Sequence, residues 1–223
     1  MFGNIERYKA IRSERECNIV EFWMRRLFSS IFYFHTYRIL HPQNPFFTPI
    51  AIRKIETLLN IDTQIFEWGS GISTIWFAKR VKNLISVEHD KEWYRKGLSS
   101  LKKVGLTNVD LIFSPPINID FFSLRNESEL YSGLTYFPKR TQFNEYIRTI
   151  DKYPDRYFDC VSIDGRERFE CLIHAIPKLS KDGFIILDDS HRSRYKEFFR
   201  ILAEWELEKF DFGLLQTTIF HRK

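Results

Sequence analysis

The sequence is poor in the residues that would cross-link a fold or bind a metal through sulfur. It contains only three cysteines, Cys17, Cys160 and Cys171, an odd number without the close pairing of a zinc site. This count argues against a disulfide framework and favours free thiols in a reducing compartment, so we expect a cytoplasmic protein. Positive charge is modest too, with 34 Lys and Arg against 29 Asp and Glu, a net charge of +5 and no long basic run. Such an excess suits an anionic small molecule and does not indicate a nucleic-acid-binding tail.

Long apolar runs are also missing. The N-terminus is charged from Glu6 onward and does not read as a signal peptide. The most apolar stretch, residues 27–40, contains His35 and Arg38 and is too short to cross a bilayer, so we expect no transmembrane segment. A helix resting on a membrane surface is an alternative there, but a helix packed on the domain, or one that joins two copies in a homo-oligomer, fits better.

What the sequence has in quantity is apolar and aromatic residues. Of its 223 residues, 43% are hydrophobic and 22 are Phe, which is enough for one domain with a large core. Residues 1–40 read as helical, and prolines at 42, 45 and 49 end that region. We therefore divide the chain into an N-terminal helical extension, residues 1–46, and a main domain, residues 47–223.

The main domain alternates between buried strands and amphipathic helices. Strands are expected at 64–67, 84–88, 109–114, 158–164, 184–188, 207–212 and 214–220, and helices at 50–60, 72–80, 91–104, 142–151, 167–179 and 195–204. The alternation predicts an α/β fold with a doubly wound, mostly parallel seven-stranded sheet. The last two strands are joined at Gly213, too tightly for a parallel crossover, so the sheet ends in an antiparallel hairpin. An irregular stretch, residues 115–139, is long enough to form the wall of a binding site.

The strongest motif is a glycine turn between the first strand and the following helix. Residues 66–74 read FEWGSGIST, in which glycines allow a sharp turn close to a ligand and the helix start offers free N–H groups. Glu67 precedes the turn, where it suits a cationic amino group better than a pyrophosphate. The second strand ends in Glu88, which is placed to accept hydrogen bonds from two ribose hydroxyls.

These features resemble the cofactor half of class I S-adenosylmethionine-dependent methyltransferases, and the similarity extends over about residues 48–223. The resemblance implies that Glu67, Gly69, Gly71 and Ser73, with Ser70 and Thr74 of the same turn, hold the methionine part of S-adenosylmethionine. It also implies that Glu88 holds the ribose and that Ser114 borders the adenine. The terminal hairpin is similar to the last two strands of that fold.

A second group of residues is acidic. Asp164 follows one strand and Asp188 and Asp189 follow the next, so three carboxylates should meet at the same edge of the sheet. Like charges need a cation there, and an oxygen-only set favours Mg²⁺. The pattern is similar to metal-dependent O-methyltransferases of the catechol and macrocin types, which implies Asp164, Asp188 and Asp189 as metal ligands. The alternative is metal-free, with Asp164 touching only cofactor or substrate and Asp189 or Ser190 capping a helix.

The expected chemistry is O-methylation. His191 follows the acidic pair and is the candidate base, with Asp164 as a second catalytic residue. Four arginines lie near helix starts, where an anionic substrate group would compensate their charge, and the alternative is that they pair with Glu167, Glu170 and the acidic residues themselves. Two tyrosines of the wall segment offer faces for a sugar. These six candidate substrate residues are Arg166, Arg168, Arg192, Arg194, Tyr131 and Tyr136.

A small-molecule or glycan hydroxyl is therefore the favoured acceptor, and a sugar is favoured over a catechol. An RNA or other nucleic-acid methyltransferase is the first alternative, although the sequence has no Asn/Asp-Pro-Pro-Tyr motif and no cysteine-nucleophile motif. The second alternative is a non-catalytic S-adenosylmethionine-binding module. A dehydrogenase fits less well because Thr74 stands where the third glycine of the dinucleotide motif would be.

Overall fold

The computed structural model describes residues 18–28, 32, 36–117, 141–213 and 215–222. Within these ranges the strands are β1 (Gln64–Trp68), β2 (Asn83–Glu88), β3 (Val109–Phe113), β4 (Phe158–Ile163), β5 (Leu179–Leu187), β6 (Glu206–Phe212) and β7 (Leu215–His221). The α-helices are α2 (Ile19–Phe28), α3 (Arg38–Leu40), α4 (Pro49–Leu58), α5 (Ile72–Ala78), α6 (Lys91–Val104), α7 (Asn144–Arg148), α8 (Arg168–Lys178) and α9 (Lys196–Ile201). Short 3₁₀ turns are η3 (Thr141–Phe143), η4 (Thr149–Lys152) and η5 (Ser193–Tyr195).

The strands form one sheet in the order β3-β2-β1-β4-β5-β7-β6. Pairing is parallel from β3 through β5, while β7 runs antiparallel to both β5 and β6. The predicted doubly wound sheet with a terminal antiparallel hairpin is therefore confirmed. The strand order reverses between β1 and β4, and in such sheets ligands bind at the carboxyl ends of the strands beside this switch point.

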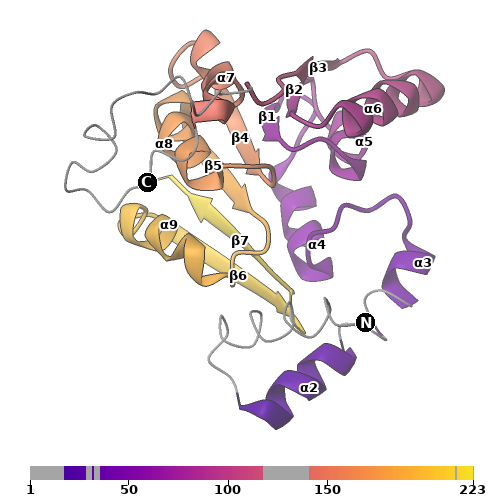
Figure 1. Ribbon diagram of the computed structural model, residues 1–223, viewed down its shortest axis with the longest axis vertical. Helices are drawn as coiled ribbons and strands as arrows, with labels where there is room; N and C mark the ends of the chain where they lie inside the picture. The colour runs from indigo at the N-terminus through magenta and orange to yellow at the C-terminus, as the bar shows by residue number, and fades with distance from the viewer. Residues whose placement is uncertain (1–17, 29–31, 33–35, 118–140, 214, 223) are drawn as a thin grey trace, which may run out of the picture.

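Helices cover both faces of the sheet, α7, α8 and α9 on one side and α4, α5 and α6 on the other (Figure 1). The first side packs Phe66, Trp68 and Val87 against Tyr146, Leu172 and Phe198. The second packs Ile65, Leu84 and Ile186 against Ile55, Trp76 and Phe77. Because successive strand residues point to opposite faces, strands buried on both sides read as nearly continuous apolar runs, which made them recognisable in the sequence.

Local capping fixes the turn that follows β2. The Asp90 carboxylate accepts hydrogen bonds from the backbone N–H groups of Glu92 and Trp93, at 2.8 and 2.9 Å, and so starts α6. The helix ends at Gly105, whose φ of 72° is left-handed. Glu88 and His89 are thereby held between the end of a central strand and a well-capped helix.

The residues before α4 contact both strands of the terminal hairpin. The ring of Phe28 in α2 lies 4.9 Å from that of Phe212 in β6. Further along, Phe47 is buried and the Thr48 N–H donates to the Thr217 hydroxyl in β7 at 3.0 Å. Residues 47 and 48 thus pack into the main domain, and the division at residue 46 stays a prediction. In the part of the chain that the structure describes, no helix has both the length and the apolarity to cross a membrane.

Candidate functional site

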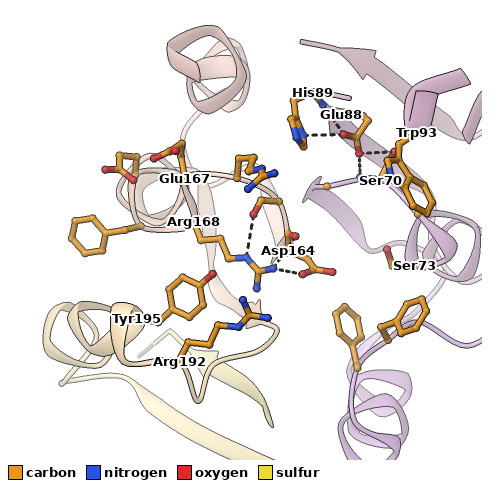
Figure 2. Close-up of a pocket in the computed structure, with 18 of the residues that line it drawn as sticks. Ser70, Ser73, Glu88, His89, Trp93, Asp164, Glu167, Arg168, Arg192 and Tyr195 are labelled. Atoms are coloured by element: carbon orange, nitrogen blue, oxygen red, sulfur yellow. Dashed lines mark hydrogen bonds and ion pairs between the residues drawn. The ribbon is translucent and has the colours of Figure 1, made fainter. Parts of the chain in front are cut away.

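A cavity of about 840 Å³ opens at the carboxyl ends of β1, β2 and β4, beside the switch point. One half is formed by the glycine turn and the β2 end, and the other by the segments after β4 and β5 (Figure 2). After the roles that the sequence predicts, we call the first half the cofactor half and the second the acceptor half. The cofactor half is lined by Gly69, Ser70, Gly71, Ile72, Ser73, Glu88, His89 and Trp93. The acceptor half is lined by Asp164, Gly165, Arg166, Glu167, Arg168, Phe169, Glu170, Arg192, Arg194, Tyr195 and Glu197, and Phe46 and Phe47 complete the wall.

The glycine turn needs its first glycine for two reasons. Gly69 has a φ of +93°, a left-handed conformation that side chains rarely adopt. A Cβ atom there would also lie 2.9 Å from the Gly165 Cα atom, so the backbones after β1 and β4 approach too closely for a side chain. This close approach brings the two halves of the cavity together.

Glu88 is the acid of the cofactor half and is held by four N–H and O–H donors, and the Nδ1 atom of the His89 ring also lies 2.9 Å from its Oε1 atom (Figure 2). Its Oε2 atom accepts from the Ser70 N–H at 2.9 Å and the Ser70 hydroxyl at 3.0 Å, and its Oε1 atom accepts from the N–H groups of His89 and Asp90 at 2.8 Å each. Burial raises the pKa of this carboxyl and the hydrogen bonds lower it, with the net result below the ordinary value. Glu88 is therefore an ionised carboxylate fixed beside the glycine turn.

Glu67 has a different place from the one predicted. It is 1% exposed and lies behind the turn, where its Oε2 atom accepts from the hydroxyls of Thr74 at 2.6 Å and Ser86 at 2.7 Å. The Thr74 hydroxyl oxygen in turn accepts from the Gly71 N–H at 2.9 Å. Burial raises the pKa of Glu67 to about 7. Glu67 and Thr74 thus brace the turn from behind, and neither belongs to the residues that line the cavity.

Asp164 stands between the two halves of the cavity (Figure 2). Its side chain is 33% exposed, and Oδ1 accepts from Arg168 Nη2 at 2.5 Å. Desolvation raises its pKa, Arg168 lowers it and Asp189 raises it, with a net rise above the ordinary value. A carboxylate of this kind, partly exposed and more basic than usual, is suited to take a proton from a bound group.

The three predicted metal ligands do not converge. Asp188 Oδ1 accepts from the Thr217 hydroxyl at 2.9 Å, on the side of β7, and Asp189 forms an ion pair with Arg192. Among the described residues no group of three His, Cys, Asp or Glu side chains is arranged to hold a metal ion. The predicted Mg²⁺ site is therefore not supported, because each of the three carboxylates faces a different protein donor.

The other predicted residues are divided between the cavity and its surroundings. The cavity is lined by Gly69, Ser70, Gly71, Ser73 and the four arginines, whose binding roles stay predictions. Ser114 is buried and donates its N–H to the Glu88 carbonyl at 2.8 Å, and it does not line the cavity. His191 is half-buried and is not a lining residue either. Tyr131 and Tyr136 lie outside the described residues.

The cavity also contains aromatic residues that the sequence reasoning missed. His89 and Trp93 lie on the cofactor side, and Phe46, Phe169 and Tyr195 belong to the rest of the wall. Trp93 could have been suspected because it follows Glu88 by five residues and lies in the first turn of α6, the helix capped by Asp90. No sequence motif near Phe46 indicates a binding role, because Phe46 reaches the cavity through contacts between segments far apart in the chain.

Comparison with known proteins identifies the fold. No family model matches the sequence, and the curated proteins give no match. Among solved structures, the chain is similar to a methyltransferase-like protein from Silicibacter pomeroyi, with a TM-score of 0.55 and 18% identity over 81% of this chain and 89% of that one. A candidate methyltransferase from Streptococcus mutans in complex with SAH has a TM-score of 0.54 and 9% identity, over 79% of this chain and 98% of that one. An rRNA methylase from Streptococcus thermophilus has a TM-score of 0.54 and 10% identity, over 80% of this chain and 99% of that one. The chain thus has the Rossmann-like methyltransferase fold.

Proposed function

We propose that the protein is an S-adenosylmethionine-dependent methyltransferase. The observation that carries the proposal is the ionised Glu88 carboxylate beside the Gly69–Gly71 turn, inside a cavity at the switch point of this fold. The similarity to a structure that contains SAH supports it. A dinucleotide cofactor fits less well, because the sequence lacks the third glycine and the sheet ends in a hairpin.

Glu88 can bind a ribose without losing its anchors. A carboxylate has about four acceptor positions, and three of those of Glu88 are taken by backbone N–H groups. The fourth is taken by the Ser70 hydroxyl, which can rotate away. A ribose hydroxyl can therefore replace the Ser70 hydroxyl at Oε2, on a carboxylate that is already fixed in place.

When bound, S-adenosylmethionine supplies an electrophilic methyl group on a positively charged sulfur. Ser73 and the turn would hold its methionine end and Glu88 its ribose, while Trp93 and His89 offer ring faces to the adenine. Asp164 would accept a hydrogen bond from the acceptor hydroxyl and take its proton. This assigns the base role to Asp164, which lines the cavity, and leaves His191 as the second candidate.

The acceptor half favours a hydroxyl compound that carries a negative charge, such as a glycan or a sugar linked to a phosphate. Arg168 and Arg192 are engaged with Asp164 and Asp189. Arg166 and Arg194 are exposed on the rim and make no ion pair with a described residue, so they are the cations that would meet an anionic group. Tyr195 and Phe169 supply the aromatic surface in the described part of the wall.

A nucleic-acid acceptor is the second candidate, favoured by the similarity to the Streptococcus thermophilus rRNA methylase. The acceptor half argues against it, because Glu167, Glu170 and Glu197 are interspersed with the arginines. A surface that follows a phosphate backbone needs several cations without such acids. Methyl transfer to bulk RNA that exceeds transfer to small acceptors would decide for this alternative.

The cofactor assignment is tested by changing the ligand and the protein in the same experiment. Calorimetry would compare SAH with its 2′,3′-dideoxy analogue on wild type and on Glu88→Gln. Hydrogen bonds to a charged group contribute about 1.5–3 kcal/mol each, so wild type should prefer SAH by at least about tenfold. The preference should shrink strongly in Glu88→Gln. Equal affinity of wild type for both ligands, or an unchanged preference in the variant, would refute the assignment. Ser70→Ala is the control, which should bind SAH at least as tightly as wild type.

A further inference from the structure

The acidic cluster already contains two cations of the protein, Arg192 on Asp189 and Arg168 on Asp164, and Arg168 is the more buried of the two. This side chain is only 11% exposed, and it reaches back from the first turn of α8 toward the ends of β4 and β5. Figure 2 shows it beside Asp164, between the β4 end and Tyr195. Its charge lies 5.4 Å from the centre of the Tyr195 ring, which covers one side of the guanidinium.

Four oxygen atoms surround the guanidinium group. Nε donates to the Gly165 carbonyl at 3.1 Å, and Nη1 donates to the Asp188 carbonyl at 2.6 Å. Nη2 donates to the Asp164 carbonyl at 3.0 Å and to Asp164 Oδ1 at 2.5 Å. A carboxylate and three backbone carbonyls from two neighbouring strand ends are thus tied to one positive charge.

We infer that Arg168, together with Arg192 on Asp189, supplies the built-in positive charge of this cluster in place of a divalent metal, and that Arg168 is the positioning residue that holds Asp164 toward the cavity. Three carboxylates at two adjacent strand ends need compensation, and a guanidinium keeps its charge at every working pH. A metal would need carboxylate oxygens that point at one centre, whereas here Asp188 faces Thr217 and Asp189 faces Arg192. The charge balance of the cluster is an inference from contacts alone. Only the orientation of Asp164 for methyl transfer rests on the proposed function.

The test uses chemical rescue of the Arg168→Ala variant. Removing one partner of a buried ion pair costs about 3–5 kcal/mol, so Tm should fall by about 10 °C. Because the cavity reaches Arg168, ethylguanidinium should restore part of the lost Tm, while ethylammonium at the same concentration should restore less. Arg168→Lys should lie between wild type and Arg168→Ala. Arg200→Ala, which removes a surface partner of Glu197, is the control and should change Tm by less than about 2 °C.

Two results would overturn the inference. One is an Arg168→Ala variant whose Tm stays within about 2 °C of wild type or gains nothing from ethylguanidinium. The other is a wild-type Tm that rises with Mg²⁺ or Mn²⁺ and loses this response in Asp188→Asn. If Arg168→Ala does not fold, the Mg²⁺ titration of wild type and the Tm of Arg168→Lys decide. If methyl transfer is detected, it should persist in excess chelator and kcat should fall more than KM rises in Arg168→Lys. Because Tm is measured without turnover, the Tm results for the Arg168 variants can be interpreted even if the proposed function is wrong.

Discussion

Glu67 should make the stability of the protein depend on pH in a direction opposite to that of an ordinary paired carboxylate. The perturbation is Glu67→Gln, which keeps the size of the side chain and removes its charge. In wild type, burial raises the pKa of Glu67 from 4.5 to about 7, and the hydroxyls of Thr74 and Ser86 only partly offset that effect. The folded state therefore binds a proton at this site more tightly than the unfolded state.

The sign and size follow from proton linkage. The raised pKa contributes stability that is fully present below the unfolded pKa of 4.5 and is lost as pH rises through the folded value near 7. At 1.36 kcal/mol for each tenfold change in the acid dissociation constant, the complete loss is about 3 kcal/mol. About 2.5 kcal/mol of it should fall between pH 5 and pH 8.

The assay is urea denaturation of wild type and Glu67→Gln at a series of pH values from 5 to 8. The difference in unfolding free energy between the two proteins should shift by about 2.5 kcal/mol in favour of the variant as pH rises, and then level off above pH 8. Glu56→Gln, at a surface glutamate paired with Arg80, is the matched control for loss of a negative charge. A difference between wild type and Glu67→Gln that does not vary with pH would refute the argument that Glu67 is buried without a compensating cation.

The remaining predictions concern the contact between the two halves and the acceptor side. A Cβ atom on Gly165 would lie 1.8 Å from the Tyr146 hydroxyl oxygen, so Gly165→Ala should lose about 1–3 kcal/mol in urea denaturation. Adding Tyr146→Phe should recover at least half of the lost unfolding free energy. A double variant without recovery would show that Gly165→Ala destabilises the protein through another contact. In a methyl-transfer assay, Asp164→Asn should lower kcat at least about a hundredfold with SAH affinity kept, whereas Arg166→Ala should chiefly raise KM for anionic acceptors. Full activity of Asp164→Asn would move the base role to His191, and methylation of uncharged phenols unaffected by Arg166→Ala would remove the anionic acceptor.

The sequence predicted the sheet well because buried strands and amphipathic helices leave a periodic signal that survives without knowledge of tertiary contacts. Helix α6 has the expected bounds, and the hairpin at Gly213 was recognisable from the shortness of the connection alone. Strand β5 begins at Leu179, five residues earlier than predicted, because Leu179 already pairs with Phe158 of β4, before an irregularity in the ladder that ends where Phe184 pairs with Cys160. The Glu88 carboxylate lies beside the turn because the end of a parallel strand determines where its last residue stands.

Side-chain direction at the strand ends was beyond the sequence, and the metal prediction depended on it. Asp188 and Asp189 lie in the turn after β5, so the alternation of an extended strand does not determine where their side chains point. Asp189 also has a left-handed backbone with a φ of 53°, which turns its carboxylate toward Arg192. One signal was available in the sequence, since Asp164 and Arg168 are four residues apart, the spacing at which an acid and a base meet across a helical turn.

The two halves of the cavity are held in place by different kinds of contact, so substitutions should affect them differently. The cofactor half holds its acid with backbone N–H groups, which most substitutions leave in place. The acceptor half is held by side-chain ion pairs. Its lining residue Glu167 and Asp189, the ion-pair partner of Arg192, are two of the non-glycine residues with left-handed backbones. Such conformations cost about 1–3 kcal/mol each and persist where the surrounding contacts enforce them. Changes after β4 and β5 can therefore alter the acceptor surface while Glu88 and the glycine turn keep their geometry.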